Sequence, residues 1–267
     1  MTLSLYSAIA TVSVKGGFTE PRQGRLGVLL GLLGLCLGVC LGAIRLDFEN
    51  QGHFNDFDSE FLIASFMRCF TQVITTSIGD DVLRRARDFA EKVAPTVGTG
   101  GVYMDTHQKN VTKIQQDHYV SKVGEEAVKQ VFEHLGKTIQ GPDYKIYQGK
   151  QKSWDSDLVV EGIDLAVKTQ TKERASQFGL SWTFQASGQR TDPILNQPNA
   201  WVCFVEFDEQ HRQCCVYPAY QIKELVFGEP KLAKLKGLKK IIYARTLPPL
   251  KPLNMKRLNT SKSLKIT

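Results

Sequence analysis

The sequence lacks the motifs of several common protein classes. It has no CxxC pair, so a zinc site is not expected. It has no GxxxxGK[ST] phosphate-binding loop and no internal repeat, which argues against a P-loop nucleotidase or a solenoid. Hydrophobic residues make up 42% of the 267 residues and charged residues 23%, which excludes a disordered or collagen-like chain.

The positive charge is concentrated in the second part of the chain. The whole sequence has 34 Lys and Arg against 27 Asp and Glu. Residues 1–103 carry 9 Lys and Arg and 10 Asp and Glu, a net charge of −1. Residues 104–267 carry the remaining 25 Lys and Arg and 17 Asp and Glu, a net charge of +8. A polyanion such as nucleic acid is therefore a natural partner for the second part.

Cysteine usage favours a reducing, cytoplasmic environment. The spacing of the six cysteines shows no disulfide framework, and the adjacent Cys214 and Cys215 suit a buried strand better than a disulfide. The cysteines are Cys36, Cys40, Cys69, Cys203, Cys214 and Cys215.

The N-terminal region, residues 1–103, contains a Leu/Gly-rich segment without charges at 26–44. Its 19 residues approach the length of about 20 that spans a bilayer, which favours a membrane anchor. A signal peptide is a second interpretation, although the region before it is unusually long. A start-site overextension is a third, because Met104 opens a segment that looks like a natural beginning. The flanking charges would place the domain that follows outside the cytoplasm, which fits poorly with a basic part that contains thiols.

Periodicity predicts an α/β domain over 104–247, preceded by a helical N-terminal region and followed by a basic tail, 248–267. Apolar residues recur at helical spacing in three stretches, 59–75, 80–94 and 119–135, and a short helix is expected at 219–226. Strands are expected at 144–147, 157–160, 163–169, 180–184, 200–207, 213–217 and 241–244.

The segment that bears on chemistry is 153–170. A two-residue connection, Glu161-Gly162, joins two of the predicted strands and makes them an antiparallel hairpin. Counting from the turn pairs Val160 with Ile163 and brings Asp157 opposite Ala166. Strand alternation then places polar groups around Ala166 on one face, and these are Asp164, Lys168 and Gln170. Carboxylates can hold a divalent cation for phosphodiester hydrolysis, and a lysine beside them can position the attacking water.

These residues resemble the PD-(D/E)xK nuclease superfamily. Asp157 matches the first acid of its motif, Lys168 matches the lysine, and Gln170 matches a glutamine often found after it. The resemblance implies a restriction-endonuclease-like core, a central mixed β-sheet flanked by helices. It also implies Mg²⁺ or Mn²⁺ as the cofactor.

Ala166 departs from this motif, because it stands where the second acid belongs. Asp164 lies on the same face and can compensate, and the resemblance makes the carbonyl of Val167 a further metal ligand. It also implies a glutamate from the preceding helix. Helical geometry favours Glu125, at the edge of the apolar stripe, over Glu126 on the solvent side.

A polar segment after the hairpin, 172–195, supplies side chains that can contact phosphates and base edges. The candidates for nucleic-acid binding are Lys172, Arg174, Gln177, Gln189 and Arg190. The lysine-rich run at 231–240 is expected to be a solvated helix face. The aromatic residues Trp182, Phe184 and Trp201 are expected in the core.

Together these features predict a metal-dependent endonuclease that acts on double-stranded DNA, of the type II restriction class. A homodimer fits the cutting of both strands, and a cognate DNA methyltransferase is a further expected partner. Three alternatives stay open: a nucleic-acid-binding module with a decayed site, favoured by Ala166, a DNA-repair-type nuclease, and a membrane-anchored protein whose domain has another role.

Overall fold

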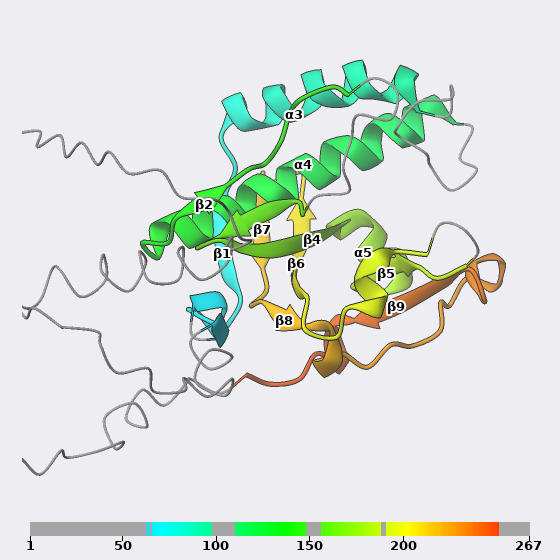
Figure 1. Cartoon of the computed structure of the whole chain (residues 1–267). Coiled ribbons are helices and arrows are strands. Elements are labelled where there is room, and N and C mark those ends of the chain that lie inside the picture. Colours follow the sequence, from blue (N-terminus) through cyan, green and yellow to red (C-terminus); the bar gives the residue numbers. More distant parts are fainter. Residues whose placement is uncertain (1–62, 65, 98–109, 148–155, 188–190, 251–267) are drawn as a thin grey trace, which may run out of the picture. The chain divides into compact units, whose positions relative to one another are not determined.

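The computed structural model describes residues 63–64, 66–97, 110–147, 156–187 and 191–250 (Figure 1). The segment 26–44, Met104 and the tail beyond residue 250 lie outside these residues. Among the described residues, no helix is long and apolar enough to cross a membrane.

Two helices cover one face of the fold. Helix α3 (Asp80–Val93) has two aspartates in its first turn and runs into a 3₁₀ turn, Ala94–Thr96, that contains Pro95. Helix α4 (Val111–His134) begins eight residues before the predicted 119 and ends near Gly136, whose φ of +73° suits glycine. Its N-terminal cap is Asn110, whose side chain accepts a hydrogen bond from the Lys113 amide at 3.1 Å.

A mixed β-sheet lies beneath these helices, so the expected α/β architecture with a mixed sheet flanked by helices is confirmed. Within the described residues, seven strands form this sheet, and six lie in the order β1-β7-β6-β4-β3-β2 while β8 pairs with β6. Strands β4 and β6 run parallel and the other pairs antiparallel. The strands are β1 (Ile74–Ser77), β2 (Ile139–Gln140), β3 (Leu158–Val160), β4 (Ile163–Thr171), β6 (Trp201–Asp208), β7 (Gln213–Val216) and β8 (Tyr220–Gln221).

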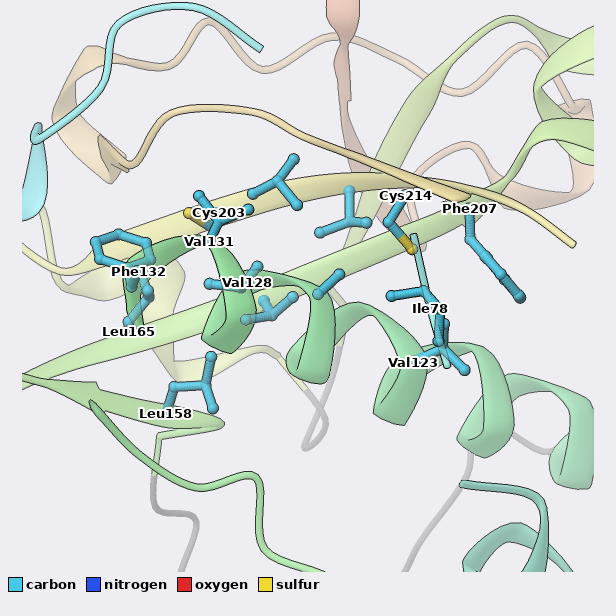
Figure 2. Close-up of a cluster of buried hydrophobic side chains, with 14 of the residues drawn as sticks. Ile78, Val123, Val128, Val131, Phe132, Leu158, Leu165, Cys203, Phe207 and Cys214 are labelled. Carbon is cyan, nitrogen blue, oxygen red and sulfur yellow. The ribbon is translucent and has the colours of Figure 1, made fainter. Parts of the chain in front are cut away.

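The main core lies between α4 and this sheet (Figure 2). Val128 and Phe132 of α4 pack with Leu158 and Leu165 of the hairpin and with Cys203 of β6. Residues of β1, α3 and the turn between them, including Ile78 and Val82, belong to the same cluster. These two elements precede residue 104, so the core extends across the boundary expected from charge.

The opposite face of the sheet carries a second core. A helix, α5 (Lys172–Phe178), follows β4 and leads to a two-stranded sheet of β5 (Ser181–Gln185) and β9 (Lys239–Tyr243). The aromatic residues assigned to the interior are all buried, since Trp182, Phe184 and Trp201 are 2%, 0% and 3% exposed. Trp182 stacks on Phe204 of β6, with ring centroids 4.6 Å apart.

The predicted hairpin is confirmed, and so is its register between Leu158–Val160 and Ile163–Leu165. Val160 pairs with Ile163, and Leu158 pairs with Leu165. Glu161 and Gly162 have φ of +50° and +78°, as a two-residue turn with both central residues in the left-handed region requires. Leu165 and Val167 face the main core, as the alternation predicts.

Three local predictions are wrong, and long-range packing explains each. The helix expected at 59–75 gives way to β1 by Ile74, because β1 pairs with β7. The segment 144–147 forms no strand; Tyr144, Ile146 and Tyr147 pack on Phe89 and Val93. The helix expected at 219–226 is β8 followed by one 3₁₀ turn, because Tyr220 pairs with Val202 of β6.

Candidate active site

A pocket of about 780 Å³ lies beside the second half of β4. Strand β3 pairs only with Ile163 to Leu165, whereas β6 accompanies β4 on its other side as far as Thr171. The edge of β4 that β3 leaves open lines the pocket from Val167 to Thr171. The same pocket contains five of the predicted site residues: Asp157, Val167, Lys168, Gln170 and Arg174.

Asp157 lies at the point where β3 pairing stops. It does not extend the strand to face Ala166; its carboxylate accepts a hydrogen bond from the Val167 amide at 2.8 Å. A strand residue directs its N–H and its C=O toward the same neighbouring strand. The Val167 carbonyl therefore points to the open side that Asp157 occupies, and one carboxylate and one carbonyl face the same side of β4.

Lys168 pairs with Asp192, a residue outside the predicted site. Its ammonium donates to Asp192 at 2.7 Å and lies 5.1 Å from the centre of the Phe184 ring. The side chains of Lys168 and Asp192 are 28% and 19% exposed, so the pair is largely shielded from water. Asp192 was not predicted from the sequence. The local signal for it is the Asp192-Pro193 step, which starts a 3₁₀ turn, and the same carboxylate accepts a hydrogen bond from the Ile194 amide.

Gln170 joins two elements at the wall of the pocket. Its side-chain oxygen accepts a hydrogen bond from the Ser181 amide at 2.7 Å, which ties the end of β4 to the start of β5. Ser181 is buried, so this bond satisfies a donor that water does not reach. Gln170 therefore has a structural task in addition to its predicted place in the site.

Glu125 is buried beneath the site, at 2% exposure. Its carboxyl accepts hydrogen bonds from Ser121 at 3.1 Å and from Lys122 at 2.5 Å. Burial raises the pKa of Glu125 to about 7; the Lys122 charge opposes this shift and the charge of Asp157 adds to it. Glu125 thus interacts electrostatically with Asp157, although it does not line the pocket.

The solvent-side placement of Glu126 is wrong. Glu126 is 4% exposed and pairs with Arg85 of α3, and it accepts a hydrogen bond from the Tyr144 hydroxyl at 3.0 Å. The periodicity of α4 alone does not show that α3 and the 144–147 segment cover this face.

Asp164 does not reach the pocket. It is exposed, lies opposite Val159, and accepts a hydrogen bond from the Ser156 hydroxyl at 2.8 Å. The structure therefore does not bring Asp164 together with Asp157, Lys168 and Gln170, contrary to the compensation expected for Ala166.

The pocket offers few protein ligands for a metal ion. In the part of the chain that the structure describes, no group of three His, Cys, Asp or Glu side chains is placed to hold a metal. Mg²⁺ does not need such a group, because it keeps several waters and binds one or two carboxylates together with substrate phosphates. Asp157 and the Val167 carbonyl, with Glu125 nearby, fit that requirement.

The predicted nucleic-acid residues divide into two groups. Arg174 lines the pocket and donates to Asp117 of α4 at 3.2 Å. Lys172 pairs with Asp208 at 2.6 Å outside the pocket, and Gln177 is exposed on α5, also outside it. Gln189 and Arg190 lie outside the described residues.

The lysine-rich run at 231–240 is not a solvated helix face. Only Ala233–Leu235 forms a 3₁₀ turn, and Lys239 and Lys240 belong to β9. Lys231, Lys234 and Lys239 line the pocket. Lys113, in the first turn of α4, also lines it and was missed because the helix was expected to begin at 119.

Comparison with known proteins adds no assignment. The chain matches no family model, no curated protein and no solved structure.

Proposed function

We propose that the protein is a metal-dependent endonuclease that hydrolyses double-stranded DNA, with a restriction-endonuclease-like catalytic core. The observation that carries the proposal is the pocket beside β4, which combines Asp157, the Val167 backbone, Lys168 and Gln170 with a cationic lining. The order of elements supports it as well: a helix that carries a glutamate, a hairpin with Asp157 before its first strand and Lys168 on its second, and then a parallel strand, β6.

The residues have distinct roles in this proposal. Asp157 and the Val167 carbonyl would hold Mg²⁺ or Mn²⁺, with Glu125 in support. The ion supplies an activated water and neutralises charge that develops on the scissile phosphate. Lys168 donates to that phosphate and orients the water, and Asp192 fixes the direction of its ammonium. Gln170 holds this end of β4 against β5. The products carry 5′-phosphate and 3′-hydroxyl ends.

Two copies of the chain would cut both strands of a site, and a methyltransferase of the same system would protect host DNA. A cytoplasmic location suits this role. A membrane anchor at 26–44 is the alternative location.

A second candidate function is DNA binding without cleavage. Two observations favour it: Ala166 stands in place of the second acid, and Lys168 is engaged by Asp192 and not by Asp157. In this alternative the pocket still binds DNA through its cations but does not hydrolyse it.

Cleavage of supercoiled plasmid by the purified full-length protein with Mg²⁺ or Mn²⁺ tests the proposal. We expect nicked and linear products. Lys168→Ala should lower the rate by about 10²- to 10⁴-fold, the usual contribution of a group that acts on the reacting atoms. Lys223→Ala is the control, because this exposed lysine donates to Asn199 outside the pocket.

The outcomes separate the candidates. Discrete fragments indicate a restriction enzyme, and a smear indicates a repair-type nuclease. DNA binding with no cleavage under either metal, or equal cleavage by wild type and a folded Lys168→Ala variant, contradicts the proposed mechanism.

A further inference from the structure

The lining of the pocket is strongly cationic. Six basic side chains contribute to it, against two carboxylates, those of Asp117 and Asp157. The cations come from α4, β4, α5 and the chain around β9, and they are Lys113, Lys168, Arg174, Lys231, Lys234 and Lys239. Four separate elements thus direct positive charge into one cavity, whereas a charged surface on one helix would use a single element.

The segment 230–235 forms one wall of this pocket, although it lies far from the hairpin in sequence. The Lys231 ammonium lies beside Gly179 at the end of α5, because a Cβ built on that glycine would be 3.3 Å from Lys231 Nζ. Gly179 has φ of +85°, a conformation that favours glycine. Two backbone hydrogen bonds, Leu235 to Leu232 and Lys236 to Ala233, shape the turn that carries Lys234. The segment is thereby positioned against α5.

Little negative charge neutralises this wall. Among the described residues, neither Lys231 nor Lys234 makes an ion pair, and both are exposed. On the α4 side, Asp117 accepts from both Lys113 and Arg174, so one carboxylate is shared by two cations. The pocket keeps a net positive charge that a bound anion would have to balance.

We infer that the segment 230–235 is a phosphate clamp, in which Lys231 and Lys234 grip the sugar-phosphate backbone of a DNA strand that enters the pocket. The inference rests on the proposed nuclease function for the identity of the polymer. DNA carries one phosphate per 3.4 Å of axis in each strand, so cations on several elements can engage successive phosphates. Phe178, which also lines the pocket, adds ring surface against which a sugar or base can pack.

The salt dependence of DNA binding tests the clamp. The full-length protein is mixed with a fluorescent duplex in EDTA, so that binding is measured without cleavage, and anisotropy is followed between about 50 and 200 mM salt. We expect Lys231→Ala/Lys234→Ala to flatten the slope of log K against log salt by about 2, one unit for each lost phosphate contact. Affinity at the lowest salt should fall at least tenfold.

The same segment offers a matched control. Lys236 and Lys240 are exposed and do not line the pocket, so Lys236→Ala/Lys240→Ala removes the same charge from the same run. Equal effects of the two double variants would show general electrostatics and overturn the clamp. A mononucleotide that binds as tightly as the duplex would also overturn it, because the site would then take a single phosphate.

The two experiments can reject the clamp and the nuclease function independently. If the Lys231→Ala/Lys234→Ala variant has the flatter salt slope but the wild-type protein does not cleave plasmid, the clamp is supported and the nuclease function is rejected. Cleavage that depends on Lys168, together with an unchanged slope in the double variant, retains the nuclease and overturns the clamp.

Discussion

The contact between Gly124 of α4 and Thr169 of β4 makes a strong prediction about stability. A Cβ built on Gly124 would lie 1.8 Å from Thr169 Oγ1 and 3.0 Å from Thr169 Cγ2. The Thr169 hydroxyl is buried and has no hydrogen-bond partner among the described residues. Because Thr169 stands between Lys168 and Gln170 on β4, this contact sets the distance between the helix and the strand that carries the proposed site.

The substitution Gly124→Ala has two opposing effects on the free energy of unfolding. Alanine favours a helix interior by about 1 kcal/mol over glycine. Overpacking in a well-packed core costs about 1–3 kcal/mol, and a contact as short as 1.8 Å requires backbone movement, because the neighbouring atom is close to the strand. We expect a net loss of up to about 2 kcal/mol in the free energy of unfolding.

A double-mutant cycle isolates the contact. Thr169→Ala removes the hydroxyl and the methyl group that a Cβ on Gly124 would strike but keeps the Thr169 Cβ, 2.9 Å away. Gly124→Ala should therefore cost less in that background, with a coupling of about 0.5–3 kcal/mol. Urea unfolding followed by the fluorescence of the buried Trp182 and Trp201 measures each variant. A Gly124→Ala protein that is more stable by about 1 kcal/mol, or a strictly additive cycle, would refute the reasoning.

Two further predictions concern buried polar groups. Because the folded protein raises the pKa of Glu125 to about 7, it keeps a proton that the unfolded chain releases near 4.5. This group therefore makes the protein less stable as pH rises from about 4.5 to 7, by about 3 kcal/mol in total, and Glu125→Gln should lack this loss in EDTA; parallel pH profiles of the two proteins would contradict this. Gln170→Leu leaves the Ser181 amide without its acceptor and should cost about 1–3 kcal/mol in chemical denaturation, whereas an unchanged midpoint would show that water replaces the bond.

The hairpin could be predicted from the sequence because its signals are local. The two-residue turn determines the pairing of Val160 with Ile163, and strict alternation along β4 determines which side chains face the core. Neither signal depends on the rest of the chain, so the two together predict that Asp157 and Lys168 lie in one neighbourhood.

The rest of the site depends on contacts between distant segments. The Lys168 partner, Asp192, lies 24 residues away. The placement of Lys231 and Lys234 depends on the pairing of β9 with β5, which no local pattern shows. The polar first turns of α4 hide the helix start, where Ile114 is the one buried side chain before Tyr119 and Asn110 provides the cap. The Asn110 cap is the local signal for a helix start that includes Lys113 and Asp117.

The pairing of β1 with β7 has a consequence for biosynthesis. Thr75 and Cys215, which face each other in this pair, are 140 residues apart. At about 5–20 residues per second, a ribosome needs roughly 7–28 s to make the intervening chain. During that time β1 has no partner strand. It is only four residues long, and its sequence, ITTS, has one large apolar side chain, so the waiting strand gives other nascent chains little to join.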